Sequence, residues 1–516
     1  MGSLGFWRRA QQSPGWTAVI EADGTRHTAG ELLARVNQVT GGLRARGLRP
    51  GDGIAAVLPN GVAPLELYLA ALQSGWYFTP INWHFTAPEI AYIVRDCEAR
   101  ALFVHERFAA AGVAAADAAG LPAAARFGYG TVPGFTDVAE LRAGQPETWP
   151  AGRTAGSTMH YTSGTTGRPK GVRRELSGLD PDEAAELSSA LLQFFGITTG
   201  PPNVHLVTSP NYHTAVTVFG GGALHLGHTL VCMDGWDAEQ VLALVERYRV
   251  TNTHMVPTQF KRMLSLPAET RRRYGLASMR WLIHAAAPCP KGIKQAMLDW
   301  WGPRVYEYYA ATEGGGTIAT PEDWLARPGT VGTPWPVSEV MVADDDGEQC
   351  PPGVPGTVYL KMGLSDFAYK DDPVKTEAGR LRGFFTVGDI GYLDADGFLF
   401  LCDRKSDMII SGGSNIYPAE IEAEIIMHPK VADVAVFGIP DDEWGEQVKA
   451  VVQPADGAQA GPELAAEIIG SLTGRLARMK WPRSVDFVDE MPRDPSGKLH
   501  KRRLREPYWA GQDRVI

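Results

Sequence analysis

Tyr161-Thr-Ser-Gly-Thr-Thr-Gly-Arg-Pro-Lys-Gly171 places hydroxyl side chains, glycines and a lysine in one short loop. Glycine lets consecutive backbone N–H groups turn inward, hydroxyls donate hydrogen bonds, and the lysine adds a positive charge. Together these groups fit a polyphosphate. The loop is not a Walker A motif, because no lysine directly follows its second glycine. The alternative, a flexible Ser/Gly linker, is disfavoured by the closing Pro169-Lys-Gly171.

The segments around this loop alternate between helix-like and strand-like patterns. The helix-like ranges are 29–46, 65–74 and 237–248, and the strand-like ranges are 17–21, 53–58 and 250–256. Such alternation predicts a layered α/β architecture with parallel strands.

The pattern changes after about residue 328. The ranges 356–362 and 390–402 are rich in strand-forming residues, and Asp394-Ala-Asp-Gly397 is typical of a hairpin turn. From Pro418 a smaller α/β pattern follows, with helices expected over 419–427 and 462–476 and strands over 434–439, 448–453 and 485–488. We therefore predict an α/β fold: a large N-terminal domain over 1–405, made of layered α/β subdomains and a β-rich subdomain, and a small mobile C-terminal α/β domain over 406–516.

Composition limits the class of protein. The 516 residues carry 49 basic and 59 acidic side chains, so the formal net charge of −10 argues against a nucleic-acid-binding surface. Hydrophobic residues make up 44% of the chain, as in ordinary soluble enzymes. No apolar run reaches the length of a membrane-spanning helix. The five cysteines are far apart, which is typical of a reducing compartment. We expect a cytoplasmic protein.

The loop over 161–171 resembles the signature loop of the adenylate-forming superfamily, which includes the acyl-CoA synthetases. Four further segments, in the family's order, support the resemblance. Tyr309-Ala-Ala-Thr-Glu313 is similar to the family's Tyr-Gly-x-Thr-Glu, and Phe385-Thr-Val-Gly-Asp389 to its Thr-Gly-Asp segment. Arg404–Glu422 matches the domain-junction motif, and Pro495-Ser-Gly-Lys498 matches the C-terminal lysine loop.

The resemblance implies ATP, Mg²⁺ and coenzyme A, and it assigns roles to particular residues. Asp389 would accept hydrogen bonds from both ribose hydroxyls, and Arg404 would reach the ribose or a phosphate. Glu313, with Thr312 beside it, would act in catalysis and hold Mg²⁺. The remaining nucleotide-binding residues are Thr162, Ser163, Gly164, Thr165, Thr166, Gly167 and Lys170 for the phosphates, and Ala286, Ala287 and Tyr309 for adenine. Core packing is the alternative for the alanines, and a helix cap or a surface position is the alternative for Glu313.

Lys498 is the main catalytic candidate by the same resemblance, and it would contact the substrate carboxylate and the α-phosphate. A carboxylate is already ionised at pH 7, so its attack needs charge neutralisation and positioning rather than a general base. For thioester formation, the C-terminal domain would rotate about a hinge near Lys405-Ser406. Gly412 and Gly413 would then line the pantetheine tunnel, where glycine allows a close approach.

The acid substrate is less well defined. His213, in Pro210-Asn-Tyr-His213, matches an aromatic-His pair that CoA ligases carry at the mouth of the acyl pocket. An aspartate that would hold an amino acid is missing there. Gly314 and the two glycines after it leave room for a bulky group. We expect a hydrophobic carboxylic acid, with medium- to long-chain fatty acids ahead of aryl or steroid-side-chain acids. A lipid substrate would also allow loose membrane association.

Two rival functions remain. One is an acyl-AMP ligase that passes the acyl group to a carrier protein, and the other is an inactive nucleotide- or acyl-binding homologue.

The chain departs from the family pattern at Ala310, Val387, Asp403 and Ser406, and none of these changes removes a charge that the mechanism needs. The basic cluster Lys501, Arg502, Arg503 and Arg505 is interpreted as a solvated helix face, with a CoA phosphate contact as the minor alternative. The expected partners are the acid and CoA, without nucleic acid, and a homodimer is left open as the assembly.

Overall fold

The computed structural model describes residues 4–162, 169–200, 202–311, 313–363, 368–369, 373–493 and 498–510. Its contacts divide the chain into two compact units. The first comprises Met1–His254, Pro267–Leu282 and Leu364–Ala378, and the second comprises Met255–Leu266, Ile283–Gly363 and Gly379–Ile516. The α/β fold is as predicted, whereas the domain boundary between residues 405 and 406 stays a prediction.

The first unit contains a six-stranded sheet in the order β7-β6-β5-β3-β4-β8, in which all neighbours are parallel. Every residue of β3 is buried, as expected for a parallel strand covered on both faces. The helices α4 and α5 pack on one face, where Ile90, Val94 and Val104 share an apolar core. The strands are β3 (Gly53–Val57), β4 (Tyr77–Pro80), β5 (Ala99–His105), β6 (Arg126–Tyr129), β7 (Thr136–Asp137) and β8 (Ser157–Thr158).

Two further groups of strands belong to this unit. The strands β12, β11 and β13 run parallel beside β1, and β2 closes the edge antiparallel to β1. The strands β9, β10 and β20 form a small antiparallel sheet. Their bounds are β1 (Thr17–Ile20), β2 (Arg26–Thr28), β9 (His160–Thr162), β10 (Lys170–Arg173), β11 (Val204–Val207), β12 (Thr229–Cys232), β13 (Asn252–Met255) and β20 (Ala368–Tyr369).

The helices of the first unit begin at local signals. Thr28 and Glu31 form a reciprocal capping box that starts α2, and Thr86 and Glu89 do the same for α4. The bounds are α1 (Phe6–Gln12), α2 (Ala29–Ala45), α3 (Val62–Leu72), α4 (Ala87–Asp96), α5 (Ala109–Ala118), α6 (Val138–Arg142), α7 (Pro181–Ser188), α8 (Ala190–Phe194), α9 (Thr214–Leu226), α10 (Ala238–Tyr248), α12 (Ala268–Arg273) and α15 (Pro373–Ala378).

The second unit is rich in antiparallel strands before residue 405. The strand β15 pairs with β16, β16 with β17, β17 with β24 and β24 with β23, all antiparallel. The predicted hairpin over 390–402 is confirmed as β23 and β24. The bounds are β14 (Trp281–His284), β15 (Val305–Ala310), β16 (Gly316–Ala319), β17 (Thr330–Pro334), β18 (Ser338–Ala343), β19 (Gly356–Met362), β21 (Arg380–Leu381), β22 (Phe384–Phe385), β23 (Asp389–Leu393), β24 (Leu399–Arg404), α11 (Pro257–Leu264), α13 (Lys291–Trp301) and α14 (Pro321–Ala326).

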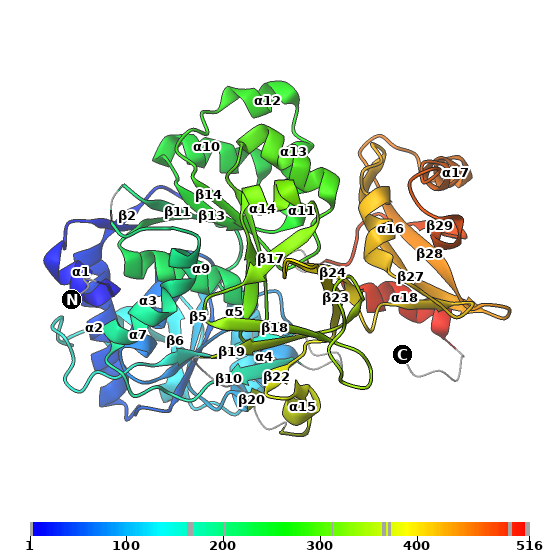
Figure 1. Ribbon diagram of the computed structural model, residues 1–516. Helices are drawn as coiled ribbons and strands as arrows, with labels where there is room; N and C mark the ends of the chain where they lie inside the picture. The colour runs from blue at the N-terminus through cyan, green and yellow to red at the C-terminus, as the bar shows by residue number, and fades with distance from the viewer. Residues whose placement is uncertain are drawn as a thin grey trace. The chain divides into compact units, whose positions relative to one another are not determined.

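The C-terminal part of this unit has a sheet in the order β26-β25-β28-β27, with β29 parallel to β28. Figure 1 shows α16, α17 and α18 beside β27, β28 and β29 in the orange and red part of the ribbon. An apolar core with Ile421, Val436 and Ile468 joins the helices to the sheet. The bounds are β25 (Ile409–Ser411), β26 (Ser414–Ile416), β27 (Val431–Asp441), β28 (Gly445–Pro454), β29 (Ser484–Phe487), α16 (Pro418–Ile425), α17 (Pro462–Gly470) and α18 (Lys501–Trp509).

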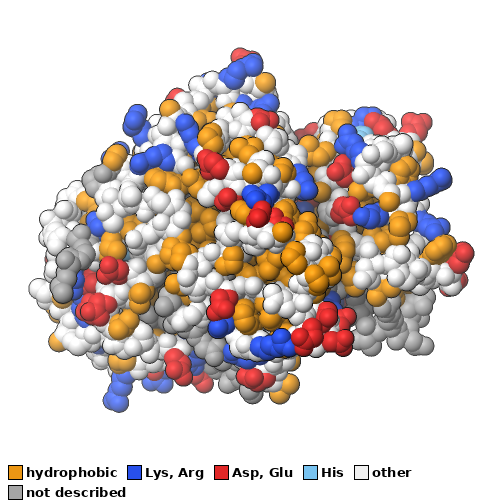
Figure 2. Space-filling model, in the orientation of Figure 1, with side chains coloured by type: hydrophobic (Ala, Val, Ile, Leu, Met, Phe, Trp, Pro, Cys, Tyr) orange, Lys and Arg blue, Asp and Glu red, His pale blue; other side chains and the backbone are white. Residues whose placement is uncertain are grey.

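Two helices differ from their predicted ranges by three or more residues at one end. The helix predicted over 65–74 begins earlier, at Val62, because the Val62 amide donates a 2.9 Å hydrogen bond to the Glu21 carboxylate. The helix predicted over 462–476 ends at Gly470, and Gly474 has a positive φ of 76° that a helix does not tolerate. On the face drawn in Figure 2, acidic and basic side chains are interspersed.

Candidate active site

Tyr309, Asp389 and Arg404 come together in the second unit. Asp389 and Arg404 lie on the neighbouring strands β23 and β24, and Tyr309 lies on β15, further along the same sheet. Asp389 opens β23 and lies directly opposite Arg404 at the end of β24. The Tyr309 hydroxyl, from β15, donates a 2.7 Å hydrogen bond to Asp389 Oδ2, and Arg404 Nε lies 3.4 Å from Asp389 Oδ1. Burial and the nearby Asp389 carboxylate hold the pKa of Tyr309 well above its ordinary value. Tyr309 therefore stays a hydrogen-bond donor at neutral pH.

Glu313 lies in the turn between β15 and β16, and it is only 7% exposed. Gly314 and Gly315 follow with positive φ angles of 125° and 73°, which favour glycine. A Cβ at Gly316 would lie 2.3 Å from the Tyr309 carbonyl oxygen, and one at Gly314 would lie 3.3 Å from Met362 Sδ. Gly316 thus allows β15 and β16 to approach closely. The role of Gly314 in substrate binding stays a prediction.

The small residues predicted for adenine lie just after β14. Ala286 is exposed and has a φ of 73°, a left-handed conformation that is uncommon for a residue with a side chain. Ala287 is half-buried. Core packing, the alternative for these alanines, does not describe Ala286. Backbone strain of this kind is concentrated at ligand sites.

The ends of the polyphosphate loop are anchored to α4 within the first unit. Lys170 pairs with Thr162 across β10 and β9. The Tyr161 hydroxyl donates a 2.5 Å hydrogen bond to Asp96, and the Tyr92 hydroxyl donates a 3.1 Å hydrogen bond to the Pro169 carbonyl oxygen. The predicted residues Ser163, Gly164, Thr165, Thr166 and Gly167 of the loop, and Thr312, lie outside the described residues.

His213 lies at the start of α9 in a group of aromatic and imidazole side chains. Tyr212 packs against its ring at a centroid distance of 4.4 Å, and Trp83 meets Tyr212 edge-on at 4.7 Å. Burial lowers the pKa of His160 and that of His254 to about 3, and the charge of His213 adds to both shifts. These two imidazoles are therefore neutral. Sequence reasoning missed them, although His160 directly precedes the polyphosphate loop.

The lysine loop is attached to the C-terminal sheet. Lys498 is half-buried, and its neighbour Leu499 forms a β-bridge with Arg493. Arg493 in turn donates a 2.8 Å hydrogen bond to Asp433 on β27. In the turn between β25 and β26, a Cβ at Gly412 would lie 2.4 Å from the Trp444 ring.

Two family models match the chain. That of the AMP-binding enzyme matches residues 6–363, and that of the AMP-binding enzyme C-terminal domain matches residues 420–498. The chain belongs to the AMP-binding enzymes.

Several relatives of this AMP-binding enzyme are CoA ligases, and one, ScoC of Streptomyces coeruleorubidus, is a fatty acid–acyl-carrier-protein ligase that is 30% identical over 98% of this chain and 96% of its own length. A feruloyl-CoA synthase from an Amycolatopsis species is 35% identical over 98% of this chain and 99% of its own length. The long-chain-fatty-acid–CoA ligase FadD13 of Mycobacterium tuberculosis is 33% identical over 98% of this chain and 97% of its own. The crystal structure of ATP-bound MatB from Rhodopseudomonas palustris has a TM-score of 0.82 and 31% identity, with 98% of each chain covered. The chain is an AMP-forming acid–thiol ligase that uses ATP, Mg²⁺ and CoA.

The side chains present fit these groups. Asp389 offers carboxylate lone pairs to ribose hydroxyls, and a buried carboxylate such as Glu313 suits Mg²⁺, which takes oxygen ligands and is bound largely through substrate phosphates. Within the described residues, three or more His, Cys, Asp or Glu side chains do not gather into a metal site made by protein alone. One carboxylate, that of Glu313, together with phosphate oxygens of ATP would give Mg²⁺ the oxygen ligands that it prefers. No helix among the described residues is long and apolar enough to cross a membrane.

One residue at which this AMP-binding enzyme departs from the family pattern makes a specific contact. Asp403 stands where glycine is usual, and its Oδ2 accepts a 2.7 Å hydrogen bond from the Ala419 amide at the start of α16. The basic cluster on α18 is not uniformly solvated, which corrects its interpretation. Lys501 Nζ lies 2.8 Å from Glu422 Oε1, whereas Arg502 is exposed and pairs with Glu506.

Proposed function

We propose that this ligase activates a hydrophobic carboxylic acid as an acyl adenylate and transfers the acyl group to CoA. In the first step a carboxylate oxygen attacks the α-phosphorus of ATP and pyrophosphate leaves. In the second, the CoA thiol attacks the acyl carbonyl and AMP leaves. The first step brings two anions together, so it depends on charge neutralisation and alignment. The second step releases the thiol proton to solvent and depends on alignment of the sulfur with the acyl carbonyl.

The proposal of a hydrophobic substrate rests on the group of aromatic side chains beside His213. Tyr212 and Trp83 pack edge-on, and Trp83 stacks on Phe108 at 5.7 Å. Burial keeps the imidazoles of His160 and His254 neutral. Neutral aromatic and imidazole surfaces favour an apolar or aryl acid over a substrate that carries a second charge.

The predicted roles of the site residues come from the resemblance to the family, and the chemistry of the side chains agrees with them. Asp389, oriented by Tyr309 and Arg404, would accept hydrogen bonds from the ribose. Glu313 would hold Mg²⁺, which when bound neutralises the phosphate charge. Lys498 would place its ammonium between the attacking carboxylate and the α-phosphate. Gly412 and Gly413 would give the pantetheine arm a close path along the backbone.

Pyrophosphate release from ATP, measured over a panel of carboxylic acids with and without CoA, tests this function. We expect release to depend on the acid, to be highest for fatty or aryl acids, and to turn over faster when CoA is present. Release that stays stoichiometric with CoA would instead indicate a carrier-protein acceptor. Preference for short, doubly charged acids would contradict the hydrophobic substrate.

A further inference from the structure

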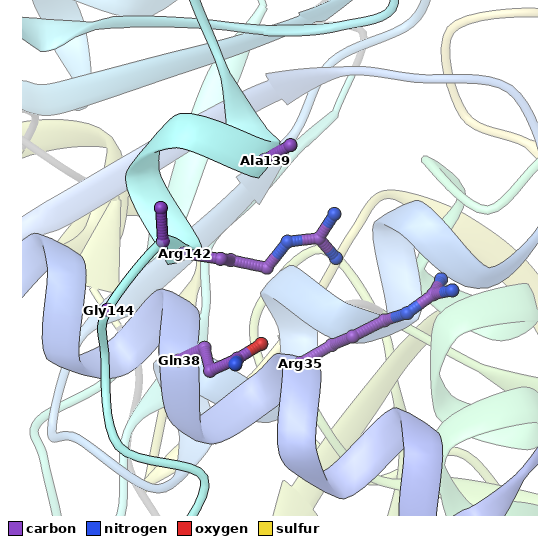
Figure 3. A pocket seen from close by; sticks show the side chains of 6 residues that line it. Arg35, Gln38, Ala139, Arg142 and Gly144 are labelled. Carbon is purple, nitrogen blue, oxygen red and sulfur yellow. The ribbon is translucent and has the colours of Figure 1, made fainter.

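A cavity of about 340 Å³ lies between α2 and α6 in the first unit. Two of its six lining residues are arginines, and none of the six is acidic. Figure 3 shows Arg35 reaching out from α2 and Arg142 from α6, with both side chains pointing in the same direction and Gln38 between the helices. We call this cavity the arginine pocket; its lining is Arg35, Gln38, Ala139, Arg142, Ala143 and Gly144.

One carboxylate lies behind the arginine pocket. Glu66, on α3, has a side chain that is 1% exposed, and its Oε2 lies 3.3 Å from the nearest Arg142 nitrogen. Burial raises the pKa of Glu66 to about 7, and the charges of Arg142 and Arg35 oppose that rise. Near neutral pH, therefore, a partly ionised Glu66 offsets at most one of the two positive charges.

Arg35 has no close ion-pair partner among the residues that the structure describes, although its charge acts on the carboxylates of Glu31 and Glu66. The residue as a whole is half-buried. Glu31, one turn earlier on α2, is engaged by its capping box, in which its carboxylate accepts hydrogen bonds from the Thr28 amide and hydroxyl. Two guanidinium groups that line the same cavity repel each other, and an anion held between them would relieve that repulsion.

We propose that the arginine pocket binds a doubly charged oxyanion of the phosphate class between Arg35 and Arg142. Guanidinium groups present planar pairs of N–H donors that match phosphate oxygens in bidentate contacts. The Gln38 amide adds a donor, because it now makes only a long 3.4 Å hydrogen bond to the exposed Glu147. The arginine pocket shares no residue with the predicted polyphosphate loop, and its proposed ligand does not depend on the identity of the acid substrate.

The affinity of the full-length protein for inorganic phosphate, measured by isothermal titration calorimetry, tests the proposal. The variant Arg35→Gln removes the unpaired guanidinium and leaves the Arg142–Glu66 pair intact. Arg100→Gln is the matched control, because Arg100 is exposed on β5 and the substitution removes the same charge. We expect Arg35→Gln to weaken a phosphate site at least tenfold and Arg100→Gln to leave it unchanged.

A third variant tests the charge balance. Glu66→Gln removes the carboxylate that competes for Arg142, so it should tighten phosphate binding severalfold. Glycerol phosphate in place of inorganic phosphate distinguishes a phosphomonoester on a larger molecule from the free ion, and Arg35-dependent binding of either supports the pocket. Equal phosphate affinity in Arg35→Gln and Arg100→Gln, with no gain in Glu66→Gln, would overturn the proposal.

Discussion

The Tyr309 hydroxyl donates a 2.7 Å hydrogen bond to Asp389 across 80 positions of the chain, which joins the proposed adenine-binding tyrosine to the proposed ribose-binding carboxylate. The tyrosine can therefore act twice, through its ring and as the group that orients Asp389. A hydrogen bond to a charged group typically contributes about 1.5–3 kcal/mol to the stability of the arrangement that contains it.

Tyr309→Phe keeps the ring and removes this donor, so we expect the KM for ATP to rise about tenfold with a smaller change in kcat. Steady-state kinetics at saturating acid and CoA measure both. Tyr392→Phe is a suitable control, because Tyr392 lies on the same strand as Asp389 but stacks on Phe400. An unchanged KM for ATP in Tyr309→Phe would show that Asp389 needs no orientation by Tyr309.

Lys498→Ala separates the two half-reactions. Loss of the ammonium that neutralises two approaching anions should slow adenylation by about 100-fold or more. Thioester formation from supplied acyl-AMP should largely persist, since Lys498 has no proposed role there. Pyrophosphate exchange measures the first step, and CoA consumption with synthetic acyl-AMP measures the second. Equal loss of both would refute the assigned role.

Lys501→Met should destabilise the C-terminal part of the protein by about 2 kcal/mol, because Glu422 would lose the cation 2.8 Å away while still largely buried. The side chains are 15% and 20% exposed, so the effect stays below that of a fully enclosed pair. Urea unfolding measures the change. Arg502→Gln breaks an exposed pair with Glu506 and should cost less than about 1 kcal/mol. Similar effects of the two substitutions would indicate that α18 is solvated throughout.

The raised pKa of Glu66 leads us to expect that the stability of the folded protein depends on pH. Burial raises the pKa of its carboxyl from 4.5 in the unfolded chain to about 7, so between these values the folded state holds a proton that the unfolded chain has released. The associated stability is present below pH 4.5 and is lost as pH rises toward 7, by roughly 3 kcal/mol in total.

Glu66→Gln should remove this loss. The variant should match the wild type near pH 4.5 and exceed its melting temperature at pH 8. Thermal unfolding of both proteins across this range measures the difference. A constant difference at every pH would mean that Glu66 is ionised throughout.

Gly412→Ala should selectively impair thioester formation. The new Cβ would lie 2.4 Å from the Trp444 ring, so the ring or the turn must move. Gly397→Ala is matched for backbone strain, since Gly397 has a φ of 83° and open space at its Cβ. We expect Gly412→Ala to reduce CoA-dependent turnover severalfold with adenylation unchanged, and Gly397→Ala to change neither. Slower adenylation in Gly412→Ala would place this turn in the first half-reaction instead.

Local patterns predicted most elements because burial repeats with the period of each helix or strand. The hairpin over 390–402 was predictable from its Asp394-Ala-Asp-Gly397 turn, and α10 from its apolar face. The end of α17 was not predictable, because the positive φ of Gly474, which a helix does not tolerate, is not revealed by the apolar pattern. The same holds for Lys501, whose charge on a basic helix gave no sign of the partner Glu422 on α16.

By itself, the sequence determined the α/β class and the family, and through motif order it indicated which side chains should meet ATP. Only the tertiary structure decided which of them touch. Tyr309 reaches Asp389, Asp403 holds the start of α16, and Arg35 lies beside Arg142 because strand register and helix packing bring together residues far apart in the chain. Such contacts, and the burial that shifts a pKa as at Glu66, depend on the whole folded surroundings, which no local pattern encodes.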